Sequence, residues 1–566
     1  MPDLDPGSEL AIEHHFSILI YPFRHQVSDQ ERTGLGGAFE PFLSATSAAS
    51  AGRSQRLHAL SHCWQTWWAR LTVRERESAE NDSYFFLPYV RDLIFPELCA
   101  ESSPGQDTVA RPPFSQSEQL AQLTSATLAS LPADAVLRLT YRPDQLESFR
   151  HLRLDFERKG FDGAVIEQFS EPFQLCWVDA VLFPQQVGFL ILKVQLSAES
   201  PPVARQRDFL HYIRLVQPPT KSWTLASWRG TASASFAFSS RDFVDFLVQG
   251  LAGPSEHVEP HLGRYLQQLT QTESSTRYSD TSDGQTYGQT FKTYTYGLVQ
   301  QRSTTADSTQ PVDPPVVAPH LGGDGTPHDD LLDSPIRRAI YELATCLDSR
   351  APTYIPDPSY VKELWDHGAF SRWENWRGMA LHDNIVFLGT RKSGFTQYGL
   401  PHNVESDYLH VYLLVLFQKT RLSMMFGDLM MRDSNLHGNL KKARHLWESF
   451  LNFQDHYWFN EVTLRPQGND LYRHFQRALD VTALHRQMSS QVRELQDYYE
   501  RKVERMLGRM VRIITFVGLP TSCVLSLFGK HFVPATLTRQ GAILGTILIY
   551  AVFIIAAYSW TYARAE

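Results

Sequence analysis

Short runs of β-branched and aromatic residues, each bounded by turn-forming residues, recur through roughly the first two thirds of the chain. In the first run, at 14–23, Phe16, Ile18 and Ile20 follow the period of two that is typical of a buried strand. Similar runs lie at 135–143, 178–183, 187–196 and 384–390. Helical periodicity is found between them, at 55–71 and 143–160. This alternation predicts a domain of mixed class, α+β or α/β.

The pattern becomes helical towards the C-terminus. Residues 408–431 contain an apolar run that is too short to cross a bilayer, which indicates a buried helix, and a further helix is expected at 438–459. Beyond them, one apolar stripe recurs at steps of three and four residues: Met488, Val492, Leu495, Tyr499, Val503, Met506 and Met510. The stripe predicts a single long stalk helix over 471–512.

Two apolar segments follow the stalk, at 513–529 and 541–561, and both are expected to be transmembrane helices joined by an outer loop at 530–540. Basic residues gather on the stalk side of the first segment: Arg501, Lys502, Arg505, Arg509 and Arg512. The loop holds only Lys530, His531 and Arg539. The positive-inside rule therefore predicts a multi-pass protein of the cell (inner) membrane with its N-terminal domain and C-terminus in the cytoplasm.

The composition changes at 268–335, where Ser, Thr, Gln, Asp, Pro and Gly dominate. Such a stretch buries little apolar surface and is expected to be a low-complexity loop or linker. It separates a cytoplasmic α/β domain at 1–267 from a helical continuation of that domain at 336–470. The expected fold class is thus an α+β (α/β) cytoplasmic domain followed by a long stalk helix and two C-terminal transmembrane helices.

The formal net charge of -8 is unevenly distributed along the chain. From Leu471 onwards there are 12 Lys and Arg against 6 Asp and Glu, a balance of +6, which leaves -14 for the preceding residues. An acidic body argues against nucleic acid as a partner, because phosphate binding needs a basic face. It suits a protein that handles cations or lies on anionic lipid.

The candidate chemistry is not that of an enzyme. The five cysteines are scattered and never have CxxC spacing, so neither a disulfide framework nor a zinc site is indicated. The first residues contain acids and no apolar run, so no secretory signal peptide is indicated there. HExxH, GxSxG and P-loop motifs are absent. We therefore expect no enzyme and no organic cofactor.

The order of a large cytoplasmic domain, a basic-ended stalk and two terminal apolar helices resembles the CorA-type divalent-cation transporters. Those proteins have a proline in the first membrane helix, followed by an aromatic-Gly-Met-Asn signature; here Pro520 precedes Phe528, Gly529, Lys530 and His531. The resemblance implies a homopentamer in which Gly529, Lys530 and His531 form the ion-entry loop. Lys530 and His531 replace the family's Met and Asn, and a histidine ring binds softer metals such as zinc.

Helical spacing independently predicts a face that would line such a pore. Stepping back from Gly529 by three or four residues gives Ser526, Ser522, Leu519, Thr515, Val511 and Gly508. Their hydroxyl groups offer oxygens to an ion, and Leu519 and Val511 would form apolar constrictions. The alternative is that these small residues serve helix packing.

Two residues are candidate metal ligands, His531 in the entry loop and Glu494 on the stalk. Glu494 falls on the same helix face as Gly508, so a ring of its carboxylates would attract a divalent cation, either transported or regulatory. The alternative is a solvated glutamate paired with a neighbouring arginine.

Two functions remain open from the sequence. The first is a CorA-like channel or transporter that passes divalent cations (Mg, or Zn, Co and Ni) down their gradient under control of the cytoplasmic domain. The second is a non-transporting membrane-anchored scaffold or a signal-gated membrane effector, which the altered entry loop favours. Homo-oligomerisation, contact with membrane lipid and binding of divalent metal ions are expected, with no nucleic acid as a partner.

Overall fold

The computed structural model resolves two compact units, one formed by residues 1–430 and 456–485 and the other by 431–455 and 486–566. It describes residues 10–24, 64–67, 71, 73–96, 136–159, 164–183, 187–215, 227–230, 237–252, 290–299, 332, 334–351, 355–431, 440–513, 515 and 518.

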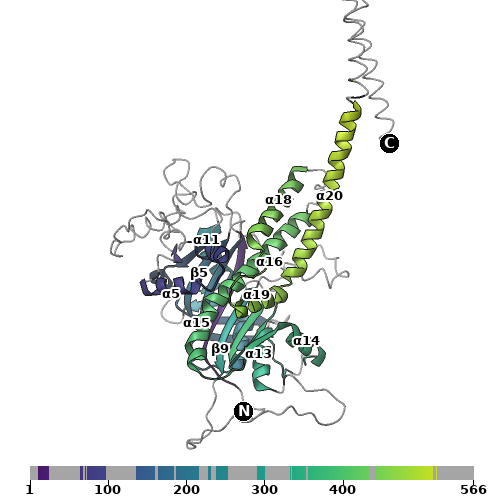
Figure 1. Ribbon diagram of the computed structural model, residues 1–566. Coiled ribbons are helices and arrows are strands. Elements are labelled where there is room, and N and C mark those ends of the chain that lie inside the picture. The colour runs from purple at the N-terminus through teal and green to yellow at the C-terminus, as the bar shows by residue number, and fades with distance from the viewer. Residues whose placement is uncertain are drawn as a thin grey trace, which may run out of the picture. The chain divides into compact units, whose positions relative to one another are not determined.

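The first unit is built on one large sheet (Figure 1). Its strands are β1 (Ile12–Arg24), β2 (Trp64–Thr66), β3 (Leu137–Tyr141), β4 (His151–Lys159), β5 (Val165–Phe183), β6 (Val187–Leu196), β7 (Ser227–Gly230), β8 (Ala237–Ser239), β9 (Lys292–Val299), β10 (Ala369–Trp373), β11 (Trp376–Ala380) and β12 (Asn384–Gly389). They are ordered β10-β11-β12-β9-β1-β6-β5-β4-β7-β8, with β3 also pairing with β5, and β2 with β3. Within this described sheet β9 and β12 pair in parallel and the other neighbours are antiparallel.

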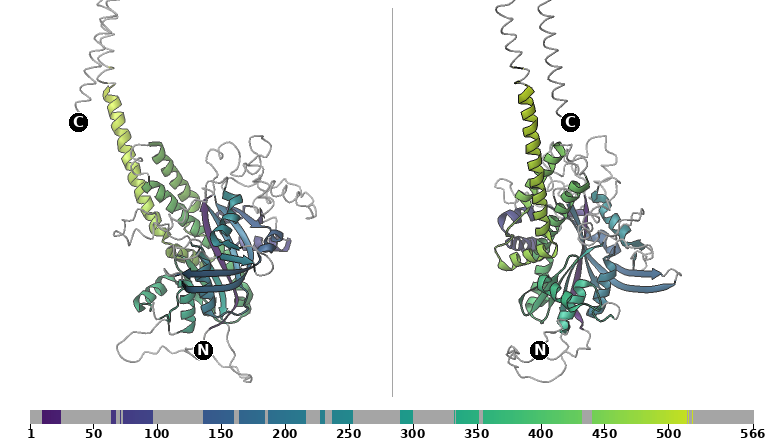
Figure 2. Two further views of the ribbon diagram at one scale, coloured as in Figure 1. Left: turned by 180° about the vertical axis from the view of Figure 1, so that it is seen from behind. Right: turned by 90° about the vertical axis from the view of Figure 1, so that its right-hand side faces the viewer.

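The described helices lie mainly around this sheet and towards the C-terminus (Figure 2). They are α5 (Val73–Ser83), α6 (Pro88–Ile94), α9 (Pro143–Leu146), the 3-10 turn η1 (Glu147–Phe149), α10 (Val203–Ile213), α11 (Ser240–Ala252), α13 (Pro335–Thr345), α14 (Pro358–Gly368), the π-helical turn η2 (Phe395–Gly399), α15 (Leu400–Glu405), α16 (Asp407–Met431), α18 (Leu440–Tyr457), α19 (Pro466–Ala478) and α20 (Val481–Ile513).

Both faces of the sheet are buried by helices. Val386 and Leu388 of β12 share a core with Ile340 of α13, which also packs against α10. Phe387, between them in the strand, points the other way and stacks on Tyr408 of α16 with ring centroids 5.9 Å apart. Because neighbouring side chains of a strand point to opposite faces, α13 and α16 cover opposite sides of β12.

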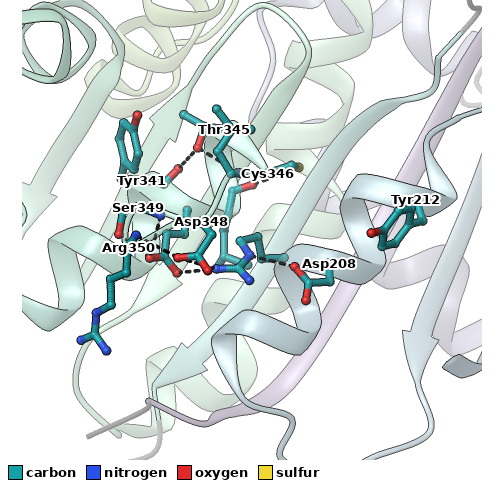
Figure 3. A network of polar contacts seen from close by, with 12 residues as sticks. Asp208, Tyr212, Tyr341, Thr345, Cys346, Asp348, Ser349 and Arg350 are labelled. Carbon is teal, nitrogen blue, oxygen red and sulfur yellow. Dashed lines mark hydrogen bonds and ion pairs between the residues drawn. The ribbon is translucent and has the colours of Figure 1, made fainter. Parts of the chain in front are cut away.

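A network of ion pairs joins α10 to the end of α13 (Figure 3). The guanidinium of Arg207, only 9% exposed, lies 2.9 Å from Asp208, 3.4 Å from Glu342 and 3.3 Å from Asp348. Ser349 donates its hydroxyl proton to the second oxygen of Glu342. The buried cation and its carboxylates thus partner one another, which makes this network a structural link between the two helices.

Several local expectations are wrong. The segment 143–160 was expected to be helical, but it is helical only as far as η1 and then forms β4, in which Leu152, Leu154 and Phe156 are buried on one face. The segment 55–71 was also expected to be helical, yet its described part contains the short strand β2. In both cases pairing with neighbouring strands overrides local helical periodicity.

The expected linker at 268–335 contains one of the central strands of the sheet. Lys292–Val299 forms β9, which is hydrogen-bonded between β1 and β12 and is buried along its whole length. The expected helical continuation at 336–470 likewise contains β10, β11 and β12. The domain at 1–267 is therefore completed by strands from the second half of the chain.

The stalk is not a single helix from residue 471. α19 ends at Ala478, and Asp480 adopts a left-handed backbone with φ of 52° before α20 begins. An L-residue rarely takes this conformation inside a helix, so the chain turns there. The continuous helix covers Val481–Ile513.

The expected fold class is corrected at the C-terminus. The chain is mixed α/β with a large sheet, but no helix among the described residues is long and apolar enough to cross a membrane. α20 is long enough, yet it carries charged residues in every turn from Arg493 to Arg512, which a bilayer interior disfavours. The segments expected to span the membrane, 513–529 and 541–561, lie outside the described residues except for positions 513, 515 and 518.

Candidate functional site

The C-terminal part of α20 carries the described members of the expected pore face. Glu494, Val511 and Thr515 are exposed, and Gly508 is half-buried with open space where a side chain would stand. Thr515 donates its hydroxyl proton to the carbonyl of Val511 at 2.8 Å. The other expected residues, Leu519, Ser522, Ser526, Gly529, Lys530 and His531, lie outside the described residues. The structure thus brings four of the ten positions onto one helix.

The carboxylate of Glu494 has no hydrogen-bond or ion-pair partner among the described residues, so the expected alternative of a neighbouring arginine partner is not seen there. Across this part of the chain, no three His, Cys, Asp or Glu side chains are grouped to hold a metal ion. A described metal site in one copy would therefore need ligands from outside that copy.

The opposite side of α20 carries its apolar stripe. Met488, Val492 and Leu495 are buried, whereas Val503, Met506 and Met510 continue the same stripe with exposed fractions of 39%, 44% and 59%. With about 3.6 residues per turn, the stripe lies nearly opposite the face of Glu494 and Thr515. One helix therefore presents an apolar face and a polar face at the same level.

A second cluster of charges lies in the first unit, beside a cavity of about 340 Å³. Arg138 donates two hydrogen bonds to Asp179, at 2.8 and 2.5 Å, and a third nitrogen lies 3.2 Å from His410 Nε2. Burial, with Arg138 nearby, lowers the pKa of His410 to about 3, which keeps its ring neutral. Its Nδ1 donates to the carbonyl of Ser406 at 2.7 Å, so Nε2 accepts from Arg138.

Glu405, on the same cavity, accepts hydrogen bonds from Trp177 at 2.8 Å and from Lys193 at 2.5 Å. The charged groups of this cavity are thus matched to one another within the fold. Sequence reasoning missed them, because Arg138, Asp179 and Glu405 are far apart in the chain. Their mutual pairing indicates a role in joining α15 and α16 to the sheet.

Comparison with protein-family models and with curated proteins found no match for this chain.

Proposed function

We propose that copies of this chain assemble around α20 and form a passage for divalent cations, which the α/β unit opens and closes. The observation that carries the proposal is the two-faced end of α20, with Val503, Met506 and Met510 exposed on one side and Glu494, Gly508 and Thr515 on the other. A helix with an exposed apolar stripe gains free energy by burying it against another helix.

Assembly would turn the polar face towards a common axis. There the carboxylates of Glu494 from several copies supply the oxygen ligands that hard divalent cations need, which one copy lacks. Val511, which is 60% exposed in the single chain, would form an apolar constriction above them. A shift between two packings of α20 would open or close that constriction.

The number of copies, the cell (inner) membrane as location and the entry loop at 529–531 remain predictions from the sequence and its resemblance to CorA-type transporters. So does the choice among magnesium, zinc, cobalt and nickel. The alternative, a scaffold or signal-gated effector, shares the assembly and differs in whether cations pass.

Cysteine cross-linking tests the assembly. In the full-length protein, Val511→Cys is expected to form disulfide-linked species on mild oxidation several-fold more than the unsubstituted chain, because this position would face its counterparts near the axis. Arg509→Cys is the matched control, since it lies on the same turn but on neither of the two faces. Non-reducing electrophoresis measures the linked fraction.

Equal linkage at positions 509 and 511 would contradict the proposed axis. A single-copy mass of about one chain for the purified full-length protein would contradict the assembly itself.

A further inference from the structure

A second cavity, of about 530 Å³, opens where three distant segments meet. We call it the aromatic–arginine pocket; its lining residues include Phe85, Arg372, Trp373, Phe395, Tyr408 and Arg465. All of them belong to the first unit. Its volume lies in the range of sites that hold small organic molecules.

Aromatic rings form the floor and the rim of this pocket. Phe85 and Tyr408 are buried at its base, with ring centroids 6.3 Å apart. Trp373 and Phe395 stand at the opening and are 55% and 42% exposed. Exposed aromatic rings beside a cavity offer flat apolar surfaces on which a planar ring system can stack.

Two arginines give the pocket its positive charge. The guanidinium of Arg465 lies over the ring of Phe85, 5.5 Å from its centre, and has no ion pair within 4.0 Å among the described residues. Buried Asp407 interacts with it electrostatically from a greater distance. Arg372 lies 3.4 Å from Asp470, and both side chains are about half exposed, so this pair is weak. The two guanidinium groups therefore remain open to an anion.

The walls are held in place by hydrogen bonds that do not involve a ligand. Asn469 accepts from the backbone N–H groups of Val462 and Thr463 at 3.0 and 3.2 Å, just before Arg465. The hairpin tip beside Trp373 is tied by Thr390, which donates to the carbonyl of Glu374 at 2.6 Å. A pocket whose walls are already fixed loses little conformational entropy when a ligand binds.

The same is true of the segment that carries Phe395. Thr396 donates to the carbonyl of Arg391 at 2.7 Å, and Tyr296 donates to the carbonyl of Thr396. Amide side chains complete the lining: Gln467 donates to the hydroxyl of Tyr408 at 2.7 Å, which leaves its carbonyl oxygen as an acceptor.

We propose that the aromatic–arginine pocket binds a nucleotide. The base stacks on the rim aromatics and meets the amide of Gln467, while Arg372 and Arg465 bind the phosphate. Stacking surfaces, amide groups and unpaired guanidinium groups in one cavity match the three parts of a base-bearing phosphate. This is an organic ligand, which the sequence did not lead us to expect, and its binding does not depend on cation passage.

Isothermal titration calorimetry of the full-length protein with AMP, GMP, CMP and UMP tests the proposal. At least one of them is expected to bind more tightly than its nucleoside or inorganic phosphate alone. Arg465→Ala and Trp373→Ala should each weaken that binding by about tenfold, since each removes one recognised part. Trp373→Phe, which keeps a stacking ring, should retain most of the affinity.

Arg150→Ala serves as the matched control, because it removes an exposed arginine outside the pocket and should leave binding unchanged. Trp373 and Arg465 are both exposed, so their replacement leaves the core intact. Absence of binding by all four nucleotides would overturn the proposal, as would equal affinity in wild type, Arg465→Ala and Trp373→Ala. None of these outcomes bears on ion flux, so the two proposals fail separately.

Discussion

Replacing Asp179 by alanine is expected to lower the free energy of unfolding by about 3–5 kcal/mol, because it leaves the guanidinium of Arg138 without its counter-ion. The Asp179 side chain is 1% exposed and that of Arg138 15%. Two hydrogen bonds to one carboxylate oxygen hold the pair together, and His410 occupies a third nitrogen of the guanidinium. Chemical denaturation followed by circular dichroism measures the change.

A surface pair provides the control. Arg150 and Glu147 lie 3.1 Å apart, but both side chains are at least half exposed, so Glu147→Ala is expected to cost no more than about 1 kcal/mol. Combining Asp179→Ala with Arg138→Met should recover much of the lost stability, since the uncompensated charge is then gone. An Asp179→Ala loss no larger than that of Glu147→Ala would contradict this description of the buried pair.

Asp407→Asn is expected to stabilise the protein at alkaline pH. Burial, with a smaller contribution from Asp82, raises the pKa of Asp407 from 3.8 to about 7, and one of its oxygens is buried without a hydrogen-bond partner. A raised carboxyl pKa means that the folded protein holds the proton more tightly than the unfolded chain does. The wild-type protein therefore loses stability as the pH rises from about 4 to about 7.

Asparagine does not titrate, so the variant escapes this loss. Relative to wild type it should be nearly neutral at pH 4 and more stable by up to about 4 kcal/mol at pH 8. Denaturation curves across this pH range measure the difference, with Asp366→Asn, on an exposed face of α14, as the control for the substitution itself. Because Arg465 and His402 interact with Asp407, the same curves should be repeated with His402→Asn. A difference that does not grow with pH would contradict the raised pKa.

Strong local patterns predicted much of the fold. β1 and α16 were expected at 14–23 and 408–431 and occur at Ile12–Arg24 and Asp407–Met431, because their apolar runs are buried almost without interruption. β4 was missed because its charged residues also fit a helix, and its pairing with β5 and β7 decides the outcome. β9 was missed because the polar sequence around it hid its eight residues.

The sites differ in the same way. The stripe on α20 follows from spacing along one helix, so Glu494, Gly508, Val511 and Thr515 could be named in advance. The aromatic–arginine pocket could not, because Phe85, Trp373 and Arg465 come from three segments that only the folded chain brings together. The break at Asp480 was equally hidden, since aspartate gives no strong signal for a left-handed backbone.

Cation flux into liposomes that hold the purified full-length protein tests the central claim most directly. We expect magnesium, zinc, cobalt or nickel to enter, with flux reduced by Glu494→Gln and its ion preference changed by His531→Asn and Lys530→Met. Flux of none of these ions, from protein that still cross-links through Val511→Cys, would contradict the passage and leave the scaffold or signal-gated effector as the function.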